Sequence, residues 1–332
     1  MTDLLPRTQE RTAPPAMTVV PVRHWGRRIV AGILLLLLAG FASTVVTNEN
    51  YHWDVVGQYL FSSRILTGLW HTLELTAISM IIGIALGVLV AIMRESTNPV
   101  FSKVAWLYIW FFRGTPLFVQ LLFWGYIAAL YPTVSIGLPF ADGPLVEAEM
   151  RELMTPWLAA VLGLSLNEGA YMAEIVRGGL ASIDQGQREA GQAMGMSRAR
   201  ILRRIILPQA MRVILPPTGN NVISMLKTTS IVSVVAFPEL LYSAQLIYAV
   251  NYLTVPLLIV ASIWYLLVTT VLTAGQHLLE RHFGQGHGPT STGTAGGTGF
   301  WGTALRLQRR STGVAGAPAT ATAAPTTTGG QP

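Results

Sequence analysis

Residues 69–93 read LWHTLELTAISMIIGIALGVLVAIM and carry one formal charge, on Glu74. A helix rises ~1.5 Å per residue, so an apolar stretch of this length spans the ~30 Å hydrocarbon core of a bilayer. The composition agrees, because 51% of the 332 residues are hydrophobic and 11% are charged, whereas soluble domains average about 25% charged residues. The stretch therefore predicts a membrane-spanning helix in an all-α integral membrane protein.

Five more apolar stretches lie around this one, and each has the length of a membrane helix. The six predicted spans cover residues 29–46, 69–93, 116–131, 156–176, 221–241 and 256–279. Gly114 and Pro116 should separate the third span from an apolar stretch that begins at Val104, since proline removes a backbone donor. We expect no strands. The first span follows Arg27 and Arg28, a pattern that also fits a cleaved signal peptide, and both readings stay open.

The basic residues are distributed unevenly between the two sides of these spans. Eighteen of the 22 fall on the side that holds both termini, while Arg64 and Arg151 fall on the other side. Cytoplasmic loops carry the excess of Lys and Arg, so we expect a multi-pass protein of the cytoplasmic membrane with both termini in the cytoplasm. The net charge of +6 then reflects topology, and we expect no nucleic-acid partner.

The two ends of the chain lack apolar periodicity. Residues 1–28 are interrupted by prolines, and residues 285–332 are mainly Gly, Thr, Ala and Pro without an acidic residue. Such compositions bury too little apolar area to fold, so we expect a disordered cytoplasmic N-terminus and a low-complexity C-terminal tail. An island at residues 300–310 holds two aromatic residues and three arginines, and it is either a short interfacial helix or part of the disorder.

The segment between the fourth and fifth spans, residues 184–208, reads DQGQREAGQAMGMSRARILRRIILP. Asp184 and the glutamine three residues later have the spacing of a capping box, so a short helix should begin there and end at Gly195. Ser197 can cap a second, amphipathic helix with apolar residues on one side and arginines on the other, and Pro208 should close it. The prediction is a helix–turn–helix elbow on the cytoplasmic face.

This elbow resembles the cytoplasmic signature of the permease subunits of binding-protein-dependent ABC importers, in particular the polar amino acid branch of histidine, glutamine and arginine permeases. That signature runs Glu-Ala-Ala, three residues, Gly, nine residues, Ile, one residue and Leu-Pro. The matching residues are Glu189, Ala190, Gly191, Gly195, Ile205, Leu207 and Pro208. Gly191 replaces the third residue of the signature, Ala, which weakens the local helix by up to ~1 kcal/mol but keeps the spacing.

Three more stretches match the same family in the same order. They are residues 113–117 (RGTPL), 170–179 (AYMAEIVRGG) and 227–230 (KTTS). The resemblance covers residues 66–283 and implies an importer transmembrane domain with five core helices, so that the helix at 29–46 is an addition. It also implies that residues 184–208 form a coupling loop that docks on a cytoplasmic ATP-binding subunit, with Glu189 and Gly195 at the contact. A basic loop that only satisfied topology would explain the arginines but not this spacing.

The same resemblance implies a set of partners. They are two copies of the ATPase subunit, a second permease that is the same or a related chain, an extracytoplasmic solute-binding protein and a polar amino acid as substrate. A nucleotide-hydrolysing P-loop needs Gly-Lys-Ser or Gly-Lys-Thr, whereas Lys103 follows Ser102 and Lys227 follows Leu226. We therefore expect a transport subunit, not an enzyme, with no cofactor of its own and with ATP and Mg²⁺ bound by the partner. The chain has no cysteine, which excludes disulfides and thiolate metal sites.

Ionisable residues within the spans need a physical reason, because each costs about 2.5–3.5 kcal/mol at the centre of a membrane helix. Glu168 lies near the middle of the fourth span, and we hypothesise that it faces the substrate path. The other candidates for that path are Tyr171, Arg113 and Lys227. The alternative is that Glu168 pairs with Lys227 or Arg113 and does not meet the substrate.

Two other spacings within the spans predict local contacts. Glu174 and Arg177 are three residues apart and should form an ion pair, with a role in gating left open. Gly83 and Gly87 have the GxxxG spacing, which favours close helix packing over a ligand site.

The favoured function is the import of a polar amino acid by alternating access, driven by a partner ATPase. The alternative is an ion- or proton-coupled secondary amino acid transporter with Glu168, Glu174 and Lys227 as coupling charges. A membrane-bound enzyme is disfavoured, since the sequence holds no metal-ligand or nucleophile motif.

Overall fold

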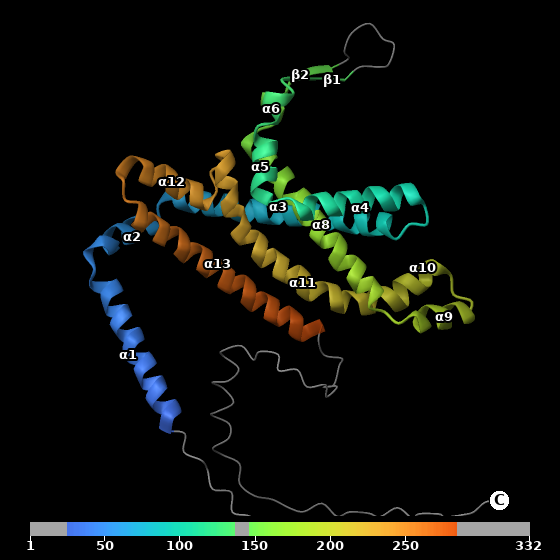
Figure 1. Cartoon of the computed structure of the whole chain (residues 1–332), viewed down its shortest axis with the longest axis horizontal. Helices are drawn as coiled ribbons and strands as arrows, with labels where there is room; N and C mark the ends of the chain where they lie inside the picture. Colours follow the sequence, from blue (N-terminus) through green and yellow to red (C-terminus); the bar gives the residue numbers. More distant parts are fainter. Residues whose placement is uncertain (1–24, 137–145, 284–332) are drawn as a thin grey trace, which may run out of the picture. The chain divides into compact units, whose positions relative to one another are not determined.

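The computed structural model describes residues 25–136 and 146–283, and these are almost entirely helical (Figure 1). In chain order the elements are α1 (Trp25–Thr47), a 3₁₀ turn (Glu49–Tyr51), α2 (Trp53–Leu60), α3 (Ser63–Arg94), α4 (Pro99–Gly114), α5 (Leu117–Gly125), α6 (Ile127–Leu130), β1 (Thr133–Ile136), β2 (Val146–Glu149), α7 (Met150–Leu153), α8 (Pro156–Ala181), α9 (Gln185–Ala193), α10 (Arg198–Ile201), a π-helical turn (Leu202–Ile206), α11 (Leu207–Thr228), a 3₁₀ segment (Thr229–Val235), α12 (Leu240–Asn251) and α13 (Thr254–Phe283). The predictions for residues 1–24, for the island at 300–310 and for the rest of the tail lie outside the described residues. Residues 25–28, which were expected to be disordered, instead form the start of α1.

Three helices of the described part, α1, α3 and α13, are long and apolar enough to cross a membrane. A fourth candidate is a bent pair, in which Arg198–Val235 and Leu240–Asn251 meet at 45°. α8 has 26 residues and covers the fourth predicted span. The all-α membrane fold predicted from the sequence is confirmed.

The third predicted span, residues 116–131, is not a single helix. α4 ends at Gly114, as predicted, and α5 begins after Pro116. A second interruption at Tyr126 then separates α5 from α6.

The fifth predicted span, residues 221–241, also differs from the expectation. Its helix begins earlier, as α11 at Leu207, and continues into the 3₁₀ segment that ends at Val235. Ala236 then adopts a left-handed φ of 58°, and Pro238 follows two residues later. A left-handed residue does not continue a right-handed helix, and proline has no backbone N–H to donate, so the chain bends before α12.

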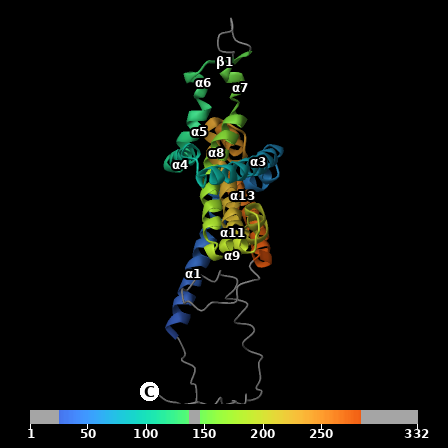
Figure 2. The same cartoon turned by 90° about the vertical axis from the view of Figure 1, so that its right-hand side faces the viewer.

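The expectation of no strands was wrong. β1 and β2 form an antiparallel pair in which Thr133 is opposite Glu149 and Ile136 is opposite Val146. The pair lies in the chain between α6 and α7 (Figure 2). Its β-branched residues suit a strand, but four residues are too short to stand out in the sequence beside the long apolar helices.

α3 and α8 make the most extensive helix–helix contact of the described residues. Glycines allow their backbones to approach. A Cβ atom at Gly83 would lie 2.8 Å from Cγ of Glu168, and one at Gly87 would lie 2.9 Å from the backbone N of Ala173. The prediction that this GxxxG spacing serves close packing is therefore confirmed.

A shared apolar core connects the helices on both sides of the elbow. It includes Leu75 of α3, Leu121 of α5, Leu164 of α8 and Met225 of α11. α11 also packs against α8 and α13. The helix that enters the elbow and the helix that leaves it are therefore parts of one packed body.

Candidate coupling elbow and charge cluster

α9 has defined caps at both ends. The Asp184 carboxylate accepts a hydrogen bond from the backbone N of Gly186 at 2.7 Å. At the other end, Gly195 has φ of 71°, and the backbone N atoms of Gly195 and Met196 donate to the carbonyls of Gln192 and Gly191 at 2.9 and 3.0 Å. This pair of bonds is a Schellman motif, which needs a left-handed residue and so favours glycine. The predicted turn at Gly195 is confirmed.

The second half of the elbow differs from the prediction. Ser197 occupies the N-cap position of α10, but its side chain makes no capping bond. Pro208 does not close the helix, because α10 continues through the π-helical turn into α11. In that turn the backbone N of Leu207 donates to the carbonyl of Leu202, five residues earlier. A wider turn directly before Pro208 accommodates its ring, which would clash with the carbonyl four residues back in a regular α-helix.

Gly191, the departure from the family signature, lies at the contact between α9 and α10. It is buried, and a Cβ atom there would lie 2.9 Å from Cγ1 of Ile201. The glycine therefore lets the two short helices pack closely, and this packing compensates for its low helix propensity.

The tip of the elbow is open. Glu189 and Gly195 are exposed, and a Cβ atom on Gly195 would meet nothing within 4 Å. Met194 beside them exposes 76% of its surface, which sequence reasoning did not single out, although a large apolar residue directly before a turn glycine was a signal. The tip thus combines a glycine, which has no side chain, with the apolar side chain of Met194 and the carboxylate of Glu189.

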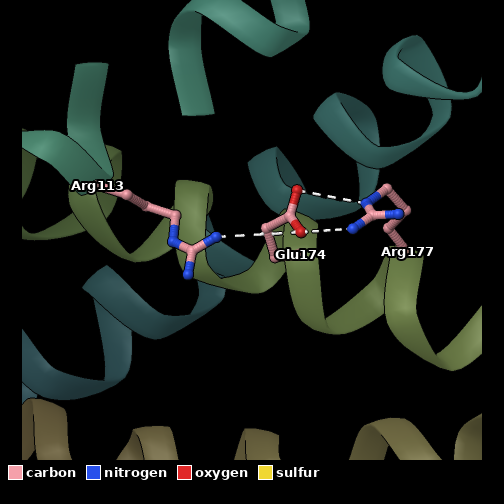
Figure 3. Close-up of polar contacts among 3 residues, drawn as sticks. All are labelled: Arg113, Glu174 and Arg177. Atoms are coloured by element: carbon pink, nitrogen blue, oxygen red, sulfur yellow. Dashed lines mark hydrogen bonds and ion pairs between the residues drawn. The ribbon is translucent and has the colours of Figure 1, made fainter. Parts of the chain in front are cut away.

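A charge cluster surrounds Glu174 on α8 (Figure 3). Arg177 binds it with two bonds, from Nη2 to Oε2 at 2.8 Å and from Nε to Oε1 at 3.3 Å, so the predicted ion pair is confirmed. Arg113, at the end of α4, places Nη1 4.0 Å from the same Oε2. One carboxylate therefore holds two guanidinium groups from two helices.

The cluster borders a cavity of about 550 Å³, which is also lined by Trp106, Trp110 and Tyr171. The guanidinium carbon of Arg113 lies 5.3 Å from the centre of the Tyr171 ring, a cation–π distance. The structure thus brings together two of the four side chains predicted for the substrate path, Arg113 and Tyr171.

The other two candidates lie elsewhere. Glu168 exposes 7% of its surface and accepts a hydrogen bond from Nδ2 of Asn221 at 2.7 Å. Lys227 is exposed in the last turn of α11. In the part of the chain that the structure describes, neither Lys227 nor Arg113 makes an ion pair with Glu168, so the predicted pairing was wrong. Glu168 lies on the face of α8 that is buried against α3 and α11, whereas Arg113 reaches α8 at Glu174.

Two amides, the buried Gln120 and the half-buried Asn167, were also missed by sequence reasoning. Gln120 of α5 and Asn167 of α8 both donate to the backbone carbonyl of Phe112, each at 3.0 Å. The available signal was Pro116, which removes the backbone donor that this carbonyl would otherwise use. Among residues 25–136 and 146–283, no group of three or more His, Asp or Glu side chains is placed to hold a metal ion.

The described residues thus combine an elbow between packed apolar helices with a charge cluster whose Arg177 borders the same cavity as the elbow, and comparisons with known proteins define the class. Residues 83–285 match the family described as "Binding-protein-dependent transport system inner membrane component". The chain belongs to this family, which confirms the resemblance found in the sequence.

Its relatives narrow the class to amino acid transport. The chain is 46% identical over 295 residues to the "Arginine transport system permease protein ArgU" of Corynebacterium glutamicum, which covers 88% of this chain and 91% of that protein. It is 36% identical to the "L-cystine transport system permease protein TcyB" of Bacillus subtilis, over 69% of this chain and 90% of that protein. A solved "amino acid ABC transporter with histidines" is 34% identical with a TM-score of 0.58, and it covers 69% of this chain and 98% of that one. The chain is therefore a permease subunit of an amino acid ABC importer.

Proposed function

We propose that this permease moves a polar amino acid into the cell by alternating access, and that two copies of an ATPase subunit drive it through the elbow of residues 184–208. The open tip at Gly195 carries this proposal, because its turn is held by its own backbone hydrogen bonds and has no partner within the described chain. The proposed contact is formed by the family signature from Glu189 to Pro208, in which Glu189, Ala190 and Gly195 are exposed and the buried Gly191 holds α9 against α10.

The elbow can transmit movement because its second half is the beginning of a long helix and its first half, α9, packs against that helix. From Arg198 to Thr228 the chain is one uninterrupted helix that includes the π-helical turn. α9 packs against this helix through Gly191 and Ile201. A displacement of the tip therefore acts first on the part of α11 before Pro216 and Pro217, the two prolines inside this helix. There Ala210 and Ile214 share a core with α8.

The charge cluster suits a zwitterionic solute. Arg113 offers a guanidinium group for a carboxylate, while Glu174 and the face of Tyr171 suit a cationic group. Charged groups in a membrane protein normally face a water-filled path, since exposure to lipid is costly. We infer that substrate passes this cavity, and that the Glu174–Arg177 pair lies at its inner end.

The substrate to test first is arginine. ArgU is an arginine permease by name and matches 88% of this chain. The proposed assembly further contains an extracytoplasmic solute-binding protein and a second permease, either another copy of this chain or a related one. Both termini of the chain then face the cytoplasm of the cell.

The test uses the complete importer in proteoliposomes. With the binding protein and labelled arginine outside, uptake should require both the ATPase subunit and internal ATP, and it should persist after ionophores collapse the ion and proton gradients. Uptake that continued without the ATPase subunit and stopped with the ionophores would instead establish a secondary transporter.

A further inference from the structure

The break between α4 and α5 leaves several carbonyl groups without helical partners, among them those of Phe112 and Thr115. In a continuous helix the carbonyl of Phe112 accepts from the backbone N of residue 116, but that residue is Pro116, which has no N–H. The carbonyl of Thr115 would accept from Val119, whose N atom instead donates to Pro116 at 3.0 Å. Both carbonyls lie in a partly buried region, where an unsatisfied polar group costs about 1–3 kcal/mol.

Gln120 satisfies both carbonyls. This side chain is 5% exposed, and its Nε2 lies 3.0 Å from the carbonyl O of Phe112 and 3.1 Å from that of Thr115. The same Nε2 lies 2.7 Å from Oγ1 of Thr115. The side-chain amide of Gln120, on the helix after the break, therefore supplies the hydrogen bonds that these two carbonyls lack.

Asn167 connects this closed break to α8. Its Nδ2 donates to the carbonyl of Phe112 at 3.0 Å and to Oε1 of Gln120 at 3.3 Å. Phe112 directly precedes Arg113. Asn167 precedes Glu174 by seven residues, which is about two helical turns along the same face of α8. One point of attachment between α4 and α8 therefore sets how far Arg113 lies from Glu174.

We propose that Gln120 and Asn167 form an amide clamp that positions Arg113 beside Glu174. Both amides are then positioning residues of the charge cluster. The proposal rests on the function inferred above for that site. A purely structural role would make the same two amides important for folding but would leave the placement of α4 against α8 unchanged in the folded protein.

The first test measures that placement without transport. The chain has no cysteine, and a Cβ atom at Gly114 or Gly178 would meet nothing within 4 Å. Spin labels on Gly114→Cys and Gly178→Cys therefore report the distance between the end of α4 and α8 in nanodiscs. We expect one narrow distance distribution with Gln120 present, and a broadened or shifted one in Gln120→Met, which has similar length but no donor.

Two further proteins make the result decisive. Gln276→Met is the matched control, because Gln276 also joins two helices through its amide, with Nε2 3.0 Å from Oδ1 of Asn220, and it should keep the narrow distribution. Gln120→Met with Pro116→Ala regains a backbone donor for Phe112, so it should fold in wild-type yield while its distribution stays altered. A distribution identical to that of the parent protein in both Gln120→Met proteins would overturn the clamp.

The second test links the clamp to transport. In the complete importer, Arg113→Gln and Glu174→Gln should each reduce the initial rate of uptake. The fold loss in the double variant should be roughly tenfold smaller than the product of the two single losses, as expected for side chains that act together. In the Gln120→Met background this coupling should fall below about twofold. Unchanged coupling would refute the positioning role, whereas an absence of ATP-driven uptake in the wild-type importer would refute the proposed function and leave the spin-label result standing.

Discussion

Glycine has opposite uses at the α3–α8 contact and at the tip of the elbow. Gly87 has ordinary helical geometry, but a Cβ atom there would overlap Cβ of Met172. Gly195 has open space around it, but its φ of 71° is one that other residues rarely adopt. The first position needs the absence of a side chain, and the second needs freedom of the backbone and a flat surface. Substitutions at the two sites should therefore fail in different ways.

The largest effect is expected at the helix contact. Gly87→Leu inserts four carbons between α3 and α8, and such overpacking should cost about 3 kcal/mol or more. The yield of monodisperse protein in detergent and its unfolding temperature should both fall. Gly40→Leu, in α1 where a Cβ atom meets nothing, is the control and should behave as wild type. A Gly87→Leu protein with normal stability would show that the close contact is not required.

The next effect is expected at the tip. Gly195→Asp should abolish ATP-driven uptake and prevent co-purification of the ATPase subunit, while the unfolding temperature changes little. Gly195→Asn is the matched control, since it carries the same left-handed strain, about 1–2 kcal/mol or less for Asn and Asp, without the charge. The Gly195→Asn protein should retain part of the wild-type uptake. Full uptake by the Asp variant would count heavily against docking at this tip.

A smaller effect is expected where the two uses of glycine meet, inside the elbow. Gly191→Val places a branched side chain against Ile201 and should destabilise the elbow by about 1–2 kcal/mol. Limited trypsin digestion should then cleave faster at Arg198 and Arg200, and uptake should fall only in part. The double variant Gly191→Val with Ile201→Ala should recover the wild-type cleavage rate. Equal cleavage rates in all three proteins would mean that α9 does not pack on α10.

The smallest effect is expected for Glu168→Gln at the α3–α8 contact. The new amide keeps an oxygen that can accept from Asn221, and its size suits the space beside Gly83. We expect normal yield and an unchanged ratio of arginine to glutamine uptake at equal concentrations. A changed ratio would return Glu168 to the substrate path, as the sequence first suggested.

The elbow could be predicted from the sequence in detail because its signals are local. The N-cap at Asp184 and the turn at Gly195 depend on residues within a few positions of each other, and both are confirmed. The capping box with Gln187 is not, because the Asp184 carboxylate accepts from Gly186 instead. The end at Pro208 was predicted wrongly, because a proline can also lie in the first turn of a helix when the preceding turn widens.

The charge cluster could be predicted only in part, because its contacts are long-range. The Glu174–Arg177 pair follows from helical spacing. The contact of Arg113 with Glu174 depends on how the break at Pro116 is closed, and that closure needs Gln120 and Asn167 from two different helices. Spacing along the chain carries no information about which helix face another segment will meet, so the partner of Glu168 was also missed.

The uninterrupted helix from Arg198 to Thr228 has a consequence for how this chain tolerates changes in length. Each residue of an α-helix turns the following side chains by about 100°. One residue inserted between Leu207 and Met225 would rotate the tip by that angle relative to the packed helices and turn Gly195 away from the proposed ATPase contact. Length variation among related permeases should therefore be rare between the elbow and Met225.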